Sequence, residues 1–482
     1  MLNTASGKNI FKLQKKEVKM QVSTRVKNIL LSMVLLLVPT FIVGQGKHKA
    51  KGDSCCELGL SITDAQRKTA TFITSNLSAD GTKAFVGYGL NPAPNPGPEG
   101  DIEAELFANN NGTLNSLGTI RYDAEFPGDI FTTASPDLQN LYVGDTNGDN
   151  TIRIRHFSGT LGLINFVQFP DYKNNLSMAL SLSPDGKYLA LSYLQTEPDT
   201  LIVRILNAQT LETISTATVI GDSSNGSSWF TLCPNKKKCK KPQLHLAITS
   251  YVSGSDGSST LSVFRFDGAN SLQLIDSAPL PFDVNAPTVT SGCHSEALIA
   301  VLAAPNYTPS EPSVMPPARV ANRQSHIQPD TNNLRIYAFG GQSLNLVYSE
   351  KIDGLNFGMI EFHPNNRCLL VSQKPAGLFS STGTTAMFRC IQRYKKKNKT
   401  ECVDARRAFG PSSIVTTEFN SFGAFNEGTN CENRGTWFLT GGDIQTGQTG
   451  LCTPIPARIF NNLNLYRVAH VPNPCCKKNG RG

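Results

Sequence analysis

The sequence predicts an all-β fold, a seven-bladed β-propeller, and three observations support this. A unit of short apolar strands around a Ser-Pro-Asp-Gly type of turn recurs through residues 54–476. The copies start at intervals of about 50 to 70 residues, as expected for blades of three or four strands. No segment shows a helical apolar period that would compete with these strands. A chain of 482 residues is long enough for one such domain behind a leader.

The clearest unit sets the pattern for the others. Met178–Ser183 is an apolar strand, Pro184-Asp185-Gly186 forms the turn, and Lys187–Tyr193 and Leu201–Leu206 are the next two strands. Asp-Gly between apolar runs is a strong hairpin signal. Comparable turns recur at Ser78–Gly81, Ser135–Asp137, Cys233–Asn235, Ser291–His294 and His363–Asn366, with a weaker one at Asn430–Gly435.

The unit over Leu182–Ile214 resembles a blade of the lactonase-like and YVTN surface-layer seven-bladed propellers. The WD40 signature is absent, because Trp229 and Trp437 are each followed by Phe and not by Asp. In the propellers that this unit resembles, the N-terminal segment supplies the outermost strand of the last blade. The resemblance therefore implies that Glu57–Ile62 lies beside Leu463–Val471.

Twelve cysteines, several of them closely spaced, indicate disulfides if the chain is exported. A link between the terminal pairs would staple the last blade, and the chain-entropy model gives such a link about 4–5 kcal/mol. Mixed pairing of exposed terminal cysteines is the alternative, and zinc lacks its short-range ligand spacing. The candidates are Cys55, Cys56, Cys475 and Cys476 at the ends, and Cys233, Cys239, Cys390 and Cys402 at two turns.

The net charge of +8 comes entirely from residues 1–53, a basic leader. Residues 29–43 form an apolar run of signal-peptide length, so we expect a signal peptide, with an uncleaved N-terminal anchor as the alternative. We expect the propeller over 54–476, a basic tail over 477–482, and a secreted, periplasmic or cell-surface location. Membrane contact is expected only through an uncleaved leader, and the neutral body argues against nucleic-acid binding.

Long insertions suggest the function. Asn91–Gly100, Pro305–Asn333, Lys374–Thr385 and Gly441–Ala457 are expected between second and third strands, on one face of the propeller. Long loops on a rigid scaffold commonly bind partners. We therefore expect a monomeric binding module for a protein or polysaccharide, and solvated decoration is the alternative.

Two lysine-rich tips are expected on the opposite face, each clasped by a local disulfide. They could contact an anionic surface, or they could be solubilising turns. Their basic residues are Lys236, Lys237, Lys238, Lys240 and Lys241 at the first tip, and Lys395, Lys396, Lys397 and Lys399 at the second.

Catalytic and metal-binding signals are weak. Asp145, Asn147 and Asp149 resemble half of a calcium loop, but His156 stands at position 12 where such a loop has Glu, so a polar turn is favoured. The common catalytic motifs are absent, and we name no catalytic residue and expect no cofactor. The resemblance leaves one alternative, a lactonase-like hydrolase with a divalent cation in the central channel.

Six Asn-x-Ser/Thr sequons are present, and they matter if the source glycosylates asparagine. They begin at Asn76, Asn111, Asn175, Asn225, Asn306 and Asn398.

Overall fold

The computed structural model divides the chain into two compact units, Met1–Asp53 and Ser54–Gly482. All the residues that it describes belong to the second unit. They contain strands and no helix, and so no helix suited to crossing a membrane. The described residues are 57–68, 72–89, 100–124, 130–147, 151–172, 178–196, 200–233, 242–251, 259–281, 284, 286–302, 333–351, 360–364, 366, 368–373, 385–394, 399–407, 418–419, 423–429, 434–444 and 460–471.

Six antiparallel blades follow one another along the chain, and each is built from one continuous stretch of sequence. The β-propeller fold expected from the repeats is confirmed. The first three blades are β2–β5 (Phe72–Leu77, Lys83–Gly89, Gly100–Asn110, Thr113–Ala124), β6–β9 (Ile130–Ala134, Asn140–Asn147, Thr151–Ser158, Leu163–Phe169) and β10–β13 (Ala179–Leu182, Tyr188–Gln195, Thr200–Asn207, Thr213–Thr218). The next three are β14–β17 (Ser223–Leu232, Gln243–Tyr251, Ser259–Phe266, Leu272–Leu280), β18 with β20–β22 (Thr288–Val289, Ala297–Leu302, Leu334–Phe339, Leu344–Glu350) and β23–β26 (Ile360–Phe362, Cys368–Gln373, Thr385–Tyr394, Lys399–Arg407). The short β19 (Cys293–His294) pairs in parallel with β14.

A further sheet joins the two ends of this unit. Its order is β1-β30-β29-β27, with β28 also paired to β29. In its register Glu57 lies opposite Val471, so the expected pairing of the N-terminal strand with the C-terminal strand is confirmed. We call this the closing sheet; its strands are β1 (Glu57–Lys68), β27 (Glu418–Phe419), β28 (Ala424–Phe425), β29 (Trp437–Ile444) and β30 (Phe460–Val471).

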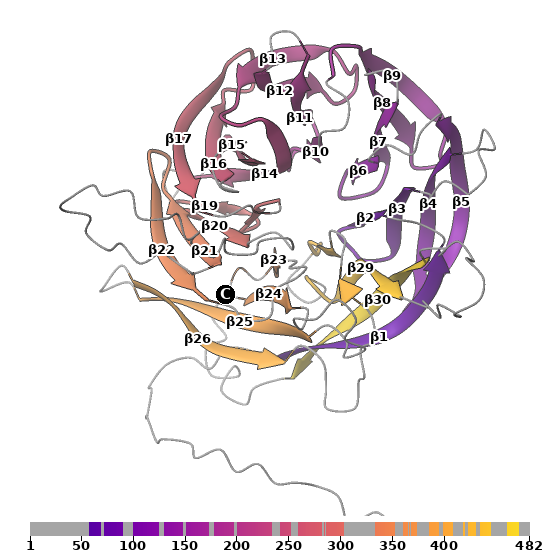
Figure 1. Cartoon of the computed structure of the whole chain (residues 1–482). Helices are drawn as coiled ribbons and strands as arrows, with labels where there is room; N and C mark the ends of the chain where they lie inside the picture. The colour runs from indigo at the N-terminus through magenta and orange to yellow at the C-terminus, as the bar shows by residue number, and fades with distance from the viewer. Residues whose placement is uncertain are drawn as a thin grey trace, which may run out of the picture. The chain divides into compact units, whose positions relative to one another are not determined.

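Figure 1 shows the sheets of this unit arranged around a central axis. The innermost strands β2, β6, β10, β14, β18 and β23 contact one another in this order, and β2 also contacts β28 and β29. On the other side of the closing sheet, the His363 ring packs against Phe425 at 5.1 Å. The ring of sheets is therefore continuous.

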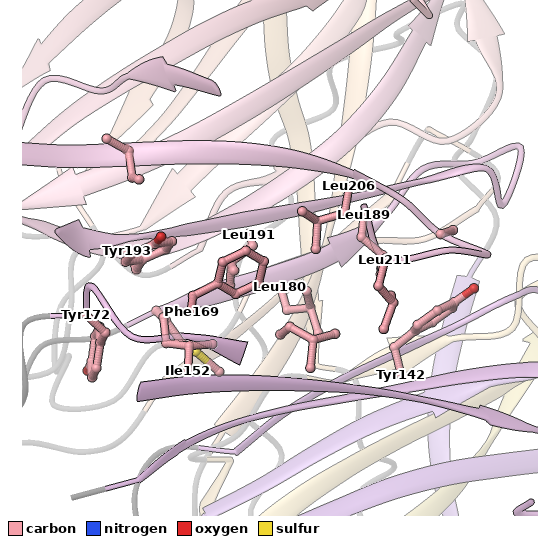
Figure 2. Close-up of a cluster of buried hydrophobic side chains, with 14 residues drawn as sticks. Tyr142, Ile152, Phe169, Tyr172, Leu180, Leu189, Leu191, Tyr193, Leu206 and Leu211 are labelled. Atoms are coloured by element: carbon pink, nitrogen blue, oxygen red, sulfur yellow. The ribbon is translucent and has the colours of Figure 1, made fainter. Parts of the chain in front are cut away.

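The hydrophobic core lies between neighbouring sheets. Between the second and third blades, Tyr142 and Ile152 pack with Leu180, Leu191 and other buried residues (Figure 2). Similar clusters fill five other spaces between successive sheets. Middle strands must therefore be apolar on both faces, and β20 and β21 are buried at every residue.

The recurring turn has a shared hydrogen-bond pattern. The hydroxyl of Ser183 donates to Asp185 at 2.7 Å and accepts the backbone N–H of Tyr188 at 2.9 Å. Ser78 and Ser135 make the same two kinds of bond in their own turns. A Ser-x-Asp sequence therefore closes the hairpin between the first and second strands, because its side chains satisfy the turn's own polar groups.

Candidate functional site

Hydroxyl side chains bridge the innermost strands of neighbouring blades. Thr74 and Thr132 share a hydrogen bond of 2.8 Å between their Oγ1 atoms, and so do the Oγ atoms of Ser181 and Ser227. Ser228 donates to the carbonyl of Pro287 at 2.6 Å. Polar side chains such as Thr, Ser and Asn on the innermost strands thus supply hydrogen-bond partners for polar groups of the next blade.

One inner position carries a carboxyl group in place of a hydroxyl. Glu361 lies in β23 between the buried Ile360 and Phe362, and it is itself half-buried. Thr288 of the preceding blade accepts the backbone N–H of Phe362 at 3.1 Å. The same Thr288 hydroxyl also hydrogen-bonds the Glu361 carboxyl group. Glu361 is thus held at the boundary between two blades.

A second carboxyl group, from Glu427 of the closing sheet's connection, interacts with the first. Desolvation by surrounding protein atoms, followed by the charge of Glu427, raises the pKa of Glu361 to about 8. Desolvation also raises the pKa of Glu427, while Ser291 and Arg434 oppose that shift. Glu427 lies in the connection between β28 and β29 and is an exposed residue, while surrounding protein atoms still desolvate its carboxyl group. We call Glu361 and Glu427 the carboxyl pair.

At neutral pH the Glu361 carboxyl group holds its proton, so it can donate a hydrogen bond or act as a general acid. The described residues hold no group of three or more His, Cys, Asp or Glu arranged for a metal ion. The protonated Glu361 carboxyl group is suited to proton transfer or to polar recognition.

The carboxyl pair was missed by the sequence reasoning, although the repeat contained a signal. In the other blades, the residue two positions before the turn is Asn, Thr, Ser, Thr or Val. Glu361 is the one acid at this position, where its equivalents are Asn76, Thr133, Ser181, Thr231 and Val289. Glu427 has no comparable signal, because only the folded chain brings it to β23.

The strand order places the long insertions as expected, between second and third strands. The four connections between these described strands are 90–99, 303–333, 374–384 and 445–459, and the strand ends that they join belong to one face. The last of these was expected to begin at Gly441, but β29 continues to Ile444. It does so because Gly441, Gly442 and Asp443 still pair with β30.

The four long connections belong to sheets that are neighbours around the ring. They are the fifth and sixth blades, the closing sheet and the first blade (Figure 1). The other three blades, also neighbours, have the shorter connections 148–150, 196–199 and 252–258. The strand ends that these four connections join therefore lie in adjacent sheets.

The lysine tips fall outside the described side chains. Residues 234–241 and 395–398 are not among the described residues, and of Lys399 only the strand position is described. The second tip does join β25 to β26, the third and fourth strands of its blade, as expected. Both tips therefore stay predictions as binding elements.

The cysteine candidates are described in part. Cys55, Cys56, Cys239, Cys475 and Cys476 lie outside the described residues. In the backbone register Cys390 is the partner of Cys368, while Cys402 is the partner of Ile391. The disulfide between Cys390 and Cys402 stays a prediction.

The half calcium loop contains a buried ion pair. Asp145 is 2% exposed and bonds to Arg155 of the next strand. The Arg155 guanidinium lies over the ring of Phe166 at 5.3 Å. Asn147 ends β7, and Asp149 lies outside the described residues. The arginine already neutralises the Asp145 carboxylate, so this residue has a structural role in the strand pair.

No protein-family model matches the chain, and no curated protein matches it. Several solved structures are similar to it in fold. A candidate 6-phosphogluconolactonase from Bacteroides uniformis is 12% identical with a TM-score of 0.38, covering 69% of this chain and 86% of its own. The Dos1 propeller is 10% identical with a TM-score of 0.41, covering 85% and 95%. Raptor from Chaetomium thermophilum is 10% identical with a TM-score of 0.45, covering 86% and 29%.

Proposed function

We propose that the chain is an exported seven-bladed β-propeller that binds a protein or polysaccharide partner through the long connections on one face. One observation carries this proposal. The four long connections belong to adjacent sheets, and they are residues 90–99, 303–333, 374–384 and 445–459. Insertions that accumulate on one half of one face can form a continuous surface, whereas scattered insertions cannot.

The closing sheet supports the count of seven. It holds the two chain ends together, and it takes its place in the ring between β2 and the blade that contains His363. With the six blades built from continuous stretches, it makes seven, and pairing of β1 with β30 leaves no open gap in the ring.

The leader and the cysteines support export. Residues 29–43 have the length and polarity of a signal segment. Disulfides among the twelve cysteines would suit an oxidising compartment. If disulfides also staple the chain ends, reduction under native conditions will lower the melting temperature. An unchanged melting temperature after complete reduction would refute the staple.

The binding proposal is tested by exchanging connections. Each long connection is replaced by a short Gly-Ser linker, and the matched control is the same replacement at 252–258 on the other half of the face. Binding is screened against polysaccharide arrays and by cross-linking to surface proteins of the source cell. We expect loss of binding for the long connections alone. Equal loss with the control, or unchanged binding by all four variants, would refute the proposal.

The carboxyl pair favours a second candidate, hydrolysis in the central channel. Glu361, protonated at neutral pH, has the pKa of a general acid, and Glu427 interacts with it. The test is a lactone and phosphoester screen, together with the metal content of the dialysed protein. Hydrolysis that Glu361→Gln abolishes, with about one divalent ion per chain, would favour the hydrolase. Hydrolysis unaffected by Glu361→Gln would reject the carboxyl pair as its site.

A further inference from the structure

The sequons of this chain differ sharply in what surrounds them. Asn76 lies in the innermost strand β2 and donates from Nδ2 to Thr132 Oγ1 at 2.9 Å. Asn225 lies in the innermost strand β14, at the bulge beside Gly226. A Cβ on Gly226 would approach Ala286 to 2.1 Å, so the backbones are tightly packed there. A sugar on Asn76 would have to break this bond to the neighbouring blade, and Asn225 is partly buried in its strand.

Asn111 occupies the opposite kind of position. It is exposed, and with Gly112 it forms the two-residue loop between β4 and β5. Both residues have positive φ, 53° and 103°, as the preferred Asn-Gly hairpin turn requires. Within the described part of the chain, the Asn111 carboxamide makes no hydrogen bond. Thr113, the hydroxyl residue of this sequon, is exposed as well.

The interior side of the same hairpin is firmly anchored. The backbone N–H of Gly112 donates to Asn109 Oδ1 at 2.8 Å, and that of Leu114 donates to Asp64 of β1 at 2.8 Å. A Cβ on Gly112 would meet Thr63 at 2.9 Å. The turn therefore buries Gly112 against the closing sheet and holds Asn111 and Thr113 outward.

We propose that Asn111 is a site of N-linked glycosylation, an inference that rests on the proposed export. The Asn111 Nδ2 atom attacks C1 of an oligosaccharide carried on a lipid diphosphate. The N–C1 bond forms, the C1–O bond to the diphosphate breaks, and the nitrogen loses one proton. The lipid diphosphate leaves with the bonding electrons, so no oxidant or reductant is needed.

The position of this glycan agrees with a binding role for the other face. The β4–β5 loop joins third and fourth strands, whereas the long connections join second and third strands. Antiparallel strand order puts these two kinds of loop at opposite ends of the blade. A glycan on Asn111 therefore leaves the long connections open to a partner.

The test expresses the full chain in a eukaryotic secretory host, once with its own leader and once behind an added cleavable signal sequence. Site-specific glycopeptide mass spectrometry then measures each sequon separately, which keeps Asn175, Asn306 and Asn398 from confusing the result. We expect Asn111 to be occupied, and Asn76 and Asn225 to be unoccupied, in the folded secreted protein.

Three variants sharpen the test. Thr113→Ala should abolish occupancy at Asn111, and Thr113→Ser should retain it. Asn111→Asp should remove one glycan without unfolding the chain, because Asp tolerates the positive φ of this turn. An unoccupied Asn111 in secreted chain from the added signal sequence would overturn the inference. Glycosylation with the added signal sequence and none with the native leader would refute export while supporting Asn111 as the acceptor.

Discussion

Replacing Glu361 by Gln should stabilise the protein at alkaline pH. The pKa of Glu361 is raised to about 8, chiefly by desolvation and then by the charge of Glu427, whereas an unfolded glutamate titrates near its ordinary value of 4.5. Between these values the folded state holds a proton that the unfolded state has lost. The contribution of Glu361 to the free energy of unfolding is therefore fully present below about pH 4.5, and it is lost as the pH rises through about 8. Gln resembles the protonated carboxyl group and does not titrate.

The size of the effect follows from the two pKa values. From pH 6.5 to 8.5 the linkage relation gives a loss of about 2 kcal/mol for the wild type. Glu361 is partly open to solvent, so screening reduces the expected loss to roughly 1–2 kcal/mol. Urea denaturation, followed by far-ultraviolet circular dichroism at several pH values, measures it. The wild type should lose this stability across the range, and the Glu361→Gln variant should not.

The interacting carboxyl group supplies the control. Glu427→Gln removes a charge that raises the pKa of Glu361, so the pH slope should shrink without disappearing. Because desolvation also raises the pKa of Glu427, the slope of the double variant should be no larger than that of Glu361→Gln alone. The reasoning is wrong if wild type and Glu361→Gln have the same pH slope between pH 6.5 and 8.5.

Two further changes test the core and the repeated turn. His245 is fully buried between two phenylalanine rings, and burial lowers its pKa to about 4. Because the unfolded imidazole gains its proton first, the contribution of His245 to stability should fall by about 2 kcal/mol from pH 7 to pH 5, opposite in sign to the contribution of Glu361 over the same range. His245→Phe should remove that fall in urea titrations, and an unchanged slope would contradict the assignment. Gly81 and Gly186 have similar φ values, +74° and +70°, but a Cβ on Gly81 would lie 2.4 Å from Trp437 Cδ1 while Gly186 has open space. Both Ala variants should lose about 1 kcal/mol of stability through backbone strain, and Gly81→Ala should lose about 2 kcal/mol more through the clash with Trp437. Thermal denaturation measures both losses. Equal losses would show that the Trp437 side chain moves aside without cost.

The blade pattern could be predicted from the sequence because its causes are local. The Ser-x-Asp turn satisfies its own polar groups, as at Ser183 and Asp185, so a short stretch of chain specifies a hairpin. Strand order within a blade follows from these hairpins. The pairing of Glu57–Ile62 with Leu463–Val471 was implied by the resemblance to lactonase-like propellers, and the observed strands extend it to Lys68 and Asn461.

Other features came from the folded chain alone. Glu427 reaches Glu361 across 66 positions of sequence, and no local pattern records that meeting. The burial of Asp145 with Arg155 turned a candidate calcium ligand into half of an ion pair. Side-chain environment depends on which sheets become neighbours, and a single blade does not contain that information.

The sequence by itself determined the all-β repeat, the direction of each connection and the basic charge of residues 1–53. The tertiary structure decided that the four long connections lie on adjacent sheets, and that Asn111 is exposed while Asn76 bonds to the next blade. The reason is physical. Hairpin turns are specified by contacts a few residues apart, whereas desolvation, accessibility and the meeting of two carboxyl groups depend on closing the ring over residues 57–471.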